Sequence, residues 1–182
     1  MLSYTQVRWN GVDDPKRKQI RLPDYDYSSA GAYFVTICTQ NRRCFLSRVD
    51  VGAIHESPVV RLTAAGRIVR QTIDALPQRY PDLLVDHSVI MPNHVHLLIR
   101  LEAERAIRES PLQPRQSTLA KAIGSLKMIS SRQIRLLKPD LKVWQRSYYD
   151  HLIRSEQDYL EIWEYIDGNP AKWTDDKYYI DP

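Results

Sequence analysis

The chain has few cysteines and no long apolar run. Its 182 residues include only two cysteines, Cys38 and Cys44, and these do not form a Cys-x-x-Cys pair. No disulfide framework is implied, so the chain is expected to fold in a reducing, cytoplasmic compartment. No stretch of about 18 apolar residues occurs, and the first residues lack the basic-then-apolar layout of a signal peptide. Neither a transmembrane helix nor a secretory leader is therefore predicted.

The charge of the chain is unevenly distributed along the sequence. The net charge is +4. Residues 100–146 carry 11 basic and 4 acidic side chains, whereas residues 147–182 carry 3 basic and 9 acidic ones. A basic middle segment beside an acidic end favours a polyanion-binding face over a uniformly basic surface. The alternative is a solvated helix face that is rich in arginine.

The order of the predicted elements indicates an α+β fold. Apolar periodicity predicts strands at 32–39, 83–90, 94–101 and within 144–154, and helices at about 64–78, 117–137 and 155–168. A hairpin or an irregular loop is expected at 40–62, and a surface loop at 102–116. The first six regular elements match the split-βαβ, ferredoxin-like pattern, in which an antiparallel sheet carries helices on one face. A further C-terminal helix follows them.

The predicted domain organisation is simple, because the length suits one domain. Residues 1–30 are polar and charged, and they are expected to form an N-terminal arm. Residues 31–173 are expected to form the single domain, and residues 174–182 a C-terminal tail.

Two histidines separated by one residue stand in a segment with strong strand character. His94, Val95 and His96 lie within residues 88–100, which are rich in β-branched and apolar side chains. Side chains at positions i and i+2 of a strand share a face, so the two imidazoles project side by side and Val95 points into a core. Two adjacent imidazoles form half of a divalent-metal site. The alternative is a pair of polar side chains on the solvent face of the strand.

A tyrosine near the C-terminus lies off the apolar stripe of the last predicted helix. That stripe consists of Tyr159, Ile162, Trp163 and Ile166. Tyr165 lies roughly 110° from the centre of the stripe on a helical wheel, so the core does not require it. Asn169 is expected on nearly the same side, although the proline after it disfavours helical geometry.

A tyrosine beside two metal-binding imidazoles indicates a specific chemistry. A phenol with a pKa of about 10 is a weak nucleophile at neutral pH. A divalent ion near a phosphodiester neutralises the non-bridging oxygens and orients the group for in-line attack. Attack by Tyr165 would give a covalent phosphotyrosine and a free strand end that can later reverse the reaction on a new target. The 11 tyrosines of the chain include rivals, but packing or base stacking is the favoured interpretation for the adjacent pair Tyr148 and Tyr149.

Three sequence blocks, in this order, resemble the HUH single-tyrosine transposases, and in particular the REP-associated tyrosine transposases. The blocks are Met91-Pro-Asn-His-Val-His96, Trp144-Gln-Arg-Ser-Tyr-Tyr-Asp-His-Leu-Ile-Arg154 and Tyr165-Ile-Asp-Gly-Asn-Pro-Ala-Lys-Trp173. Together with N-terminal segments around residues 20–27 and 32–42, the resemblance covers about residues 17–173.

The resemblance implies a fold, a reaction and a set of site residues. It implies that His94 and His96 bind Mg²⁺ or Mn²⁺, that Tyr165 is the nucleophile, and that Asn169 can complete the metal site. It also implies DNA transposition on single-stranded DNA with hairpins, such as repeated extragenic palindromes. Members of the family often act as dimers, and the sequence leaves open whether Tyr165 acts in its own subunit or across a homodimer.

Several basic and aromatic side chains are candidates for DNA contacts. They are Arg42, Arg43, Lys121, Lys127, Arg132, Trp144 and Arg146. Two interpretations of the cations are open, namely that they position DNA phosphates or that they are simply solvated. Base stacking is one interpretation of Trp144, and a place in the core is the other.

Two other function classes are also compatible with the sequence. The chain could be a hairpin DNA- or RNA-binding module without catalysis, which predicts affinity with a steep salt dependence and no covalent product. It could also be a hydrolytic metalloenzyme that uses His94, His96 and a carboxylate. A tyrosine close to the histidines favours strand transfer, whereas a carboxylate in that place favours hydrolysis.

Overall fold

The computed structural model describes residues 30–50, 58–102 and 117–180. The predicted N-terminal arm, apart from residue 30, lies outside the described residues, as does nearly all of the predicted loop at 102–116. No helix in the described ranges is both long enough and apolar enough to cross a membrane.

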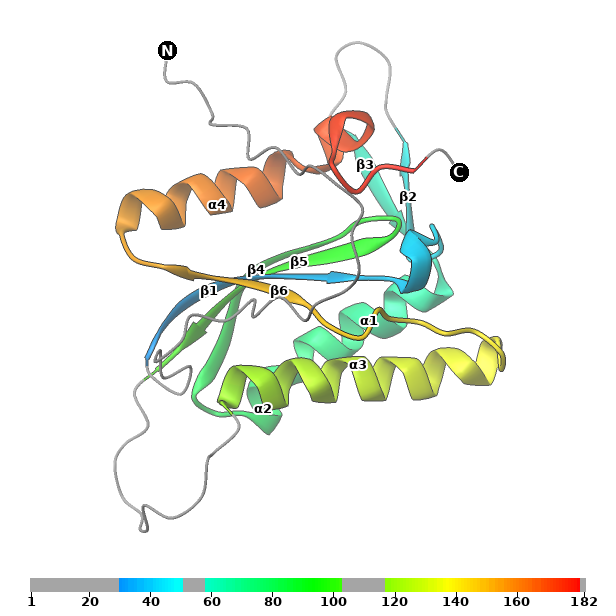
Figure 1. Cartoon of the computed structure of the whole chain (residues 1–182), viewed down its shortest axis with the longest axis horizontal. Helices are drawn as coiled ribbons and strands as arrows, with labels where there is room; N and C mark the ends of the chain where they lie inside the picture. Colours follow the sequence, from blue (N-terminus) through cyan, green and yellow to red (C-terminus); the bar gives the residue numbers. More distant parts are fainter. Residues whose placement is uncertain (1–29, 51–57, 103–116, 181–182) are drawn as a thin grey trace, which may run out of the picture.

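A four-stranded antiparallel sheet forms the centre of the molecule (Figure 1). Its strands, in the order β4-β5-β1-β6, are β4 (Leu83–Ile90), β5 (His94–Leu101), β1 (Gly31–Cys38) and β6 (Tyr149–Ile153). Strands β4 and β5 match the predicted bounds, and β1 lies one residue earlier than expected. The hairpin alternative for residues 40–62 is also observed in part, because β2 (Ser47–Asp50) pairs with β3 (Val59–Leu62) in a separate small sheet.

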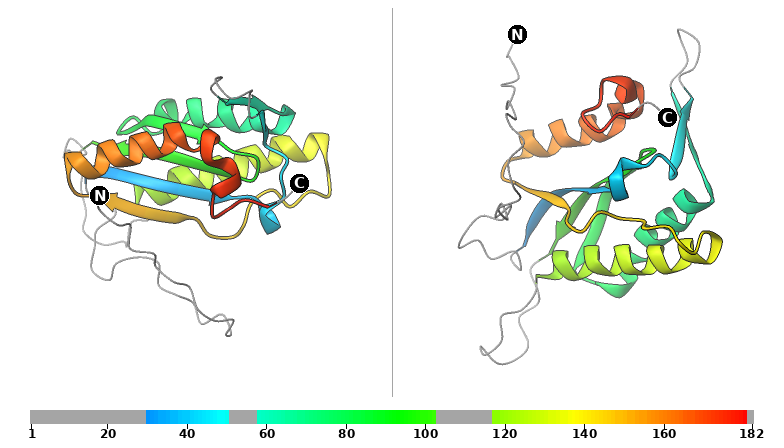
Figure 2. Two further views of the ribbon diagram at one scale, coloured as in Figure 1. Left: turned by 90° about the horizontal axis from the view of Figure 1, so that it is seen from above. Right: turned by 45° about the vertical axis from the view of Figure 1, so that its right-hand side comes forward.

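Helices cover both faces of the central sheet (Figures 1 and 2). One face carries α1 (Ala64–Asp74), α2 (Leu76–Arg79) and α3 (Thr118–Leu137), and the opposite face carries α4 (Glu156–Gly168). The α+β, ferredoxin-like prediction is therefore confirmed, with the C-terminal helix added on the second face. Short 3-10 helices, η1 (Gln40–Arg42) and η2 (Pro170–Asp175), follow β1 and α4.

Capping residues explain where the helices begin. Thr63, Ser117 and Ser155 each accept a hydrogen bond from the backbone N–H three residues later, as N-cap side chains do. The predicted single helix at 64–78 is instead two helices that meet at Ala75. Pro77 accounts for this break, because proline lacks the N–H that a continuing helix requires and restricts the residue before it.

The two faces of β5 have different surroundings. Val95, Leu97 and Ile99 are buried in the larger core, which also receives side chains of α1 and α3. On the other face, Leu98 packs with Phe34, Ile153 and Ile166 beneath α4. Because side chains alternate along a strand, His94 and His96 share the α4 face with Leu98. The prediction that Val95 enters a core is confirmed.

The chain after α4 turns back toward the sheet end at which β5 begins. The Asn93 side-chain amide donates to the carbonyl of Tyr178 at 2.7 Å, and Arg42 donates to the carbonyl of Lys177 at 3.2 Å. Residues 176–178, named the closing segment below, are thereby held against Asn93, which directly precedes β5, and against Arg42 in η1. The predicted domain limits at residues 30 and 173 stay predictions.

Candidate active site

The two histidines of β5 lie side by side and are fully buried. Their ring centroids are 4.5 Å apart, and both residues are 0% exposed. The Nδ1 atom of His94 lies 2.9 Å from Asn93 Oδ1, an acceptor, so this nitrogen carries the proton. The Nδ1 atom of His96 lies 2.9 Å from Thr36 Oγ1. Such partners fix the orientation of each ring and leave the Nε2 atoms available as ligands.

Two buried polar atoms at this place have no hydrogen-bond partner among the described residues. They are His94 Nε2 and Asn169 Oδ1. Leaving a buried acceptor unpaired costs on the order of 1–3 kcal/mol, so such atoms are uncommon in folded proteins. A bound cation would satisfy both lone pairs.

A carboxylate completes the cluster. Potential ligand atoms of His94, His96 and Asp176 all lie within 4.8 Å of one another. Asn169 Nδ2 donates to Asp176 Oδ2 at 2.7 Å, and the Tyr178 N–H donates to Asp176 Oδ1 at 2.6 Å. The closing segment thus presents an oriented carboxylate to the imidazoles, and these residues fit a divalent cation.

Asp176 is not among the site residues predicted from the sequence. The residue lies in the segment predicted as a tail, and no periodic pattern links it to β5. The one available signal is the acidic pair Asp175-Asp176, which follows Asn169 by only a few residues.

Burial controls the protonation of the histidines. Burial lowers the pKa of His94 to about 4, although the nearby Asp176 carboxylate raises it. Burial, and then the charge of His94, hold the pKa of His96 well below its usual value. Both rings are therefore neutral near pH 7, which is the form that binds metals.

Tyr165 reaches the histidines from α4. Its hydroxyl lies 3.5 Å from His96 Nε2, and its ring meets Phe34 edge-on at a centroid distance of 5.9 Å. The residue is 41% exposed, so one side of the ring faces solvent. Burial raises the pKa of Tyr165, as do the charges of Asp176 and Tyr178, whereas a hydrogen bond from Asn169 lowers it. Asn169 itself is 2% exposed, and the structure brings both predicted residues to the histidine pair.

A second tyrosine, which sequence reasoning missed, lies at the same site. The Tyr178 ring centroid is 4.6 Å from that of His94 and 6.0 Å from that of His96. Burial is the main cause that raises the pKa of Tyr178 to about 12. The Arg42 guanidinium lies 5.4 Å from the centre of the Tyr178 ring, within the range of a cation–π interaction.

The backbone beside the closing segment is strained. Asn41 and Arg42 have φ values of 55° and 53°, in the left-handed region that residues other than glycine rarely adopt. Each such residue costs on the order of 1 kcal/mol or more. Arg42 is also the residue whose guanidinium contacts both Lys177 and Tyr178.

The predicted DNA contacts fall into three groups. Arg42 and Arg43 are exposed at the end of η1. Lys127, Trp144 and Arg146 line one cavity beside α3. Lys121 and Arg132 are exposed on α3 and do not line it.

The placement of Trp144 favours its core interpretation. The residue is 8% exposed, and its indole N–H donates to Ser130 Oγ at 2.9 Å. Little of the ring is therefore available for base stacking.

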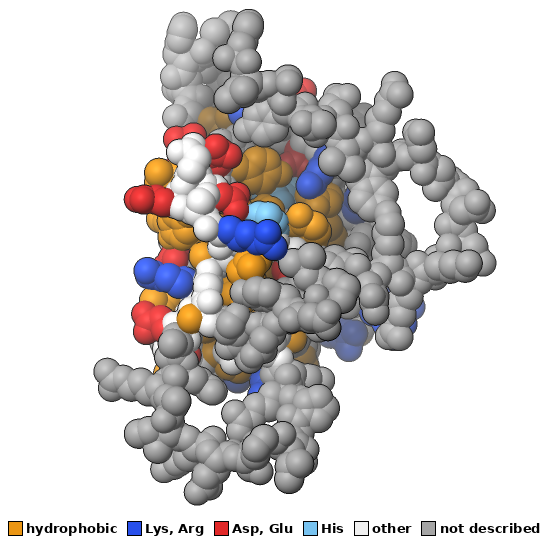
Figure 3. All heavy atoms as spheres, turned by 60° about the vertical axis from the view of Figure 1, so that its left-hand side comes forward, with side chains coloured by type: hydrophobic (Ala, Val, Ile, Leu, Met, Phe, Trp, Pro, Cys, Tyr) orange, Lys and Arg blue, Asp and Glu red, His pale blue; other side chains and the backbone are white. Residues whose placement is uncertain are grey.

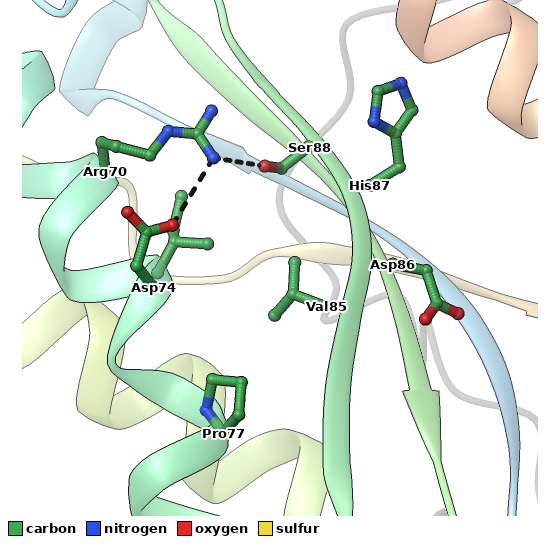
Figure 4. Close-up of a pocket in the computed structure, with 8 residues that line it drawn as sticks. Arg70, Asp74, Pro77, Val85, Asp86, His87 and Ser88 are labelled. Carbon is green, nitrogen blue, oxygen red and sulfur yellow. Dashed lines mark hydrogen bonds and ion pairs between the residues drawn. The ribbon is translucent and has the colours of Figure 1, made fainter.

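Another cavity, with a volume of about 430 Å³, lies between α1 and the edge strand β4 (Figure 4). Arg70 donates to Ser88 Oγ and lies 3.8 Å from the Asp74 carboxylate. None of the predicted site residues lines this cavity, so it is separate from the histidine pair.

Comparisons with known proteins agree with this geometry at the level of the fold. No model of a known protein family matches the sequence. A Haemophilus influenzae protein named only "Uncharacterized protein" is 37% identical over 175 residues, which cover 91% of this chain and 94% of that one. The chain belongs to the family of this protein.

A solved structure of a REP-associated tyrosine transposase bound to a REP hairpin is similar with a TM-score of 0.54 and 21% identity. The match covers 83% of this chain and 74% of that one. The present chain thus has the fold of a REP-associated tyrosine transposase, and the predicted resemblance is confirmed at that level.

Proposed function

We propose that this protein is a metal-dependent DNA strand transferase that cuts and rejoins single-stranded DNA through a 5′-phosphotyrosine at Tyr165. The observation that carries the proposal is the 3.5 Å distance between the Tyr165 hydroxyl and His96 Nε2. A potential nucleophile therefore lies beside a cluster of two imidazoles and a carboxylate. The basic segment at 100–146 and the shared fold support DNA as the substrate.

The cation would be held by His94, His96 and Asp176. Asn169 would supply Oδ1 as a further ligand, while its Nδ2 atom orients the Asp176 carboxylate. When bound, it neutralises charge on the non-bridging phosphate oxygens and fixes the phosphodiester for in-line attack. Imidazole nitrogens suit Mn²⁺, whereas Mg²⁺ is bound mainly by oxygen ligands. We therefore expect Mn²⁺ to bind more tightly than Mg²⁺.

The reaction needs one bond to form and one to break at phosphorus. The Tyr165 oxygen attacks the phosphorus, the bond to the 3′ oxygen breaks, and the 3′ oxygen leaves as a hydroxyl after it takes a proton. Tyr165 must lose its own proton in the attack, because its raised pKa keeps it protonated at neutral pH. Because Tyr165 is partly exposed, water is the acceptor that we assign to this proton. In the reverse step, a 3′ hydroxyl attacks the phosphotyrosine and restores the phenol.

The proposed substrate is a hairpin or palindromic repeat in DNA, and the proposed place of action is the cytoplasm. The transposase of similar fold was solved bound to a REP hairpin. The Tyr165 hydroxyl lies 3.5 Å from His96 Nε2 of the same chain, which supports a tyrosine that acts in its own subunit. A homodimer is then compatible with the reaction but not required by it.

The test is an adduct assay with a labelled hairpin oligonucleotide and Mn²⁺, read on a denaturing gel. We expect a protein–DNA adduct with the natural chain and none with Tyr165→Phe. Tyr178→Phe is the matched control, because it removes the other phenol of the site, and it is expected to retain the adduct. An adduct that persists in Tyr165→Phe would contradict the assignment of the nucleophile.

A second candidate function is metal-dependent hydrolysis of phosphodiesters. The observation in its favour is the carboxylate of Asp176 beside the two imidazoles, although the tyrosine expected for strand transfer is present too. Hydrolysis predicts DNA with a free terminal phosphate, no adduct, and full activity in Tyr165→Phe. The non-catalytic alternative predicts hairpin binding without an adduct and without cleaved DNA, whichever divalent ion is added.

A further inference from the structure

We propose that a cavity on the α3 face binds the phosphodiester backbone of the DNA strand that extends from the tyrosine site. The proposal rests on the proposed function for the identity of the strand. The cavity has a volume of about 470 Å³. It lies between the second half of α3 and the segment that returns from α3 toward β6, which Figure 1 shows running back along the helix. Its lining residues are Gln40, Lys127, Met128, Ser131, Arg135, Lys142, Val143, Trp144, Gln145 and Arg146.

All the charged side chains that line this cavity are positive. Four of its lining side chains are cations, and none is a carboxylate. Over residues 30–50, 58–102 and 117–180, no acidic side chain pairs with Arg135, Lys142 or Arg146, and all three are exposed. Three cations without an acidic partner among the described residues surround one hollow, and this arrangement favours a polyanion. The planar guanidinium groups match the oxygen pairs of a phosphate.

The fourth cation supports the wall of the cavity. The Lys127 ammonium donates to the carbonyls of Gln145 at 2.6 Å, Arg146 at 2.9 Å and Ser147 at 3.3 Å. It thereby holds the turn that carries Arg146. Lys127 is consequently a positioning residue, and not the direct DNA contact predicted from the sequence.

The cavity and the histidine pair share one end of the sheet. Cys38 pairs with His94 in the register of β1 and β5, and the Gln145 N–H donates to the Cys38 carbonyl at 3.0 Å. Two residues further on, the Gln40 N–H donates to the carbonyl of Val143 at 2.9 Å. Both Gln40 and Gln145 line the cavity. A strand that leaves the tyrosine site past the end of β1 would therefore reach the cavity within a few nucleotides.

The side chains of the cavity suit a strand rather than an isolated phosphate. Gln40 and Ser131 offer neutral hydrogen-bonding groups, and Met128 adds an exposed apolar surface for a sugar or base. The cations that line the hollow, spread from Arg135 to Arg146, can contact successive phosphates. Nonspecific backbone binding of this kind is expected for a processed single strand.

The test compares two variants with the same change of charge. Arg135→Gln with Lys142→Gln removes two cavity cations, whereas Arg67→Gln with Arg79→Gln removes two exposed cations of α1 and α2 that do not line the cavity. Binding is measured by fluorescence anisotropy, without Mn²⁺, on single-stranded oligonucleotides of two lengths. The short one spans only the tyrosine site, and the long ones are extended on either the 5′ or the 3′ side.

The cavity variant is expected to bind one of the long strands about 10-fold more weakly at low salt. The slope of log affinity against log salt concentration should become less steep by about 1.4, since two phosphate contacts are lost. The control variant is expected to bind like the natural chain, and neither pair should alter binding of the short strand. Equal losses in both variants, or no loss in the cavity variant, would overturn the proposal. Displacement of the long strand by a mononucleotide at similar concentration would also overturn it, because the cavity would then be a site for small phosphates. The binding assay needs no covalent step. Its result is therefore independent of whether the chain forms the adduct of the proposed function.

Discussion

Helices α3 and α4 cover opposite faces of one sheet and carry opposite charge. Helix α3 has four basic and no acidic side chains, whereas α4 has five acidic and no basic ones. Figure 3 shows a group of acidic side chains at the height where Figure 1 places α4. The candidate nucleophile therefore stands on a helix that repels DNA, and the candidate strand-binding cavity lies on the basic side.

This contrast suggests a division of labour between the two faces. The α4 face offers buried imidazoles, a carboxylate and a phenol, which suit a cation and a covalent step. The α3 face offers exposed cations, which suit a phosphate backbone. Repulsion by α4 would restrict DNA to the end of the sheet at which β5 begins, where Tyr165 and Asp176 meet.

The largest expected effect comes from removal of an imidazole. His96→Ala deletes one of three candidate ligands, so Mn²⁺ affinity should fall by at least about 100-fold, and adduct formation should fall with it. Calorimetric titration with Mn²⁺ measures the loss. His87→Ala on the neighbouring strand is the control, since His87 bonds Asp167 rather than the cluster. Similar loss in both variants would show that the fold, and not a ligand, had been damaged.

A smaller loss of Mn²⁺ affinity is expected when the Asp176 carboxylate is neutralised. Asp176→Asn keeps the size of the side chain but removes its charge, which should weaken Mn²⁺ binding by about 10- to 100-fold. Asp175→Asn changes an exposed carboxylate at the adjacent position and should bind Mn²⁺ normally. If the two variants bind the ion equally well, the closing segment is not part of the metal site.

The buried histidines also predict how stability depends on pH. The pKa of His94 is about 4 in the folded, metal-free protein and about 6.5 in an unfolded chain. The unfolded state thus binds more protons between these values, so the free energy of unfolding should decrease as pH falls from about 6.5 to 4. The loss from this residue amounts to roughly 3 kcal/mol.

Urea unfolding at several pH values in the presence of a chelator measures this dependence. His94→Gln should flatten the curve over the same range. A metal-free protein whose stability is constant from pH 7 to pH 4 would contradict the burial of a neutral histidine pair.

The smallest expected effect concerns the repulsion by α4. Glu164→Gln removes one exposed carboxylate from the helix that carries Tyr165. DNA affinity should rise by about two-fold or less at physiological salt, because exposed charges are strongly screened. The same change in 1 M salt should have no effect. An effect that grows with added salt would exclude an electrostatic origin.

Local sequence patterns predicted the parts of the site that lie on regular elements. The alternation along β5 placed His94 and His96 on one face, and the helical wheel placed Tyr165 off the apolar stripe. The bounds of β4 and β5 followed from apolar runs on either side of Met91-Pro-Asn93. These features depend on neighbours within a few residues, which a sequence displays directly.

Local patterns could not predict the parts of the site that depend on contacts between residues far apart in the sequence. Asp176 and Tyr178 reach the histidines only because the chain turns back after Pro170, and no periodicity marks that segment. The bonds of Lys127 to residues 145–147 likewise depend on how α3 meets the returning chain. The break at Ala75 was foreseeable from Pro77, but the helical spacing continued through it and masked the signal.

The most direct test of the account is to identify the residue linked to DNA by mass spectrometry. The natural chain is incubated with a labelled hairpin oligonucleotide and Mn²⁺, and the adduct is digested with trypsin and nuclease. Cleavage after Arg154, Lys172 and Lys177 separates the peptide of Tyr165 from that of Tyr178, and fragmentation distinguishes Tyr165 from Tyr159. We predict a phosphonucleotide on Tyr165. A modified Tyr178, or cleaved DNA without any modified tyrosine, would contradict the central claim.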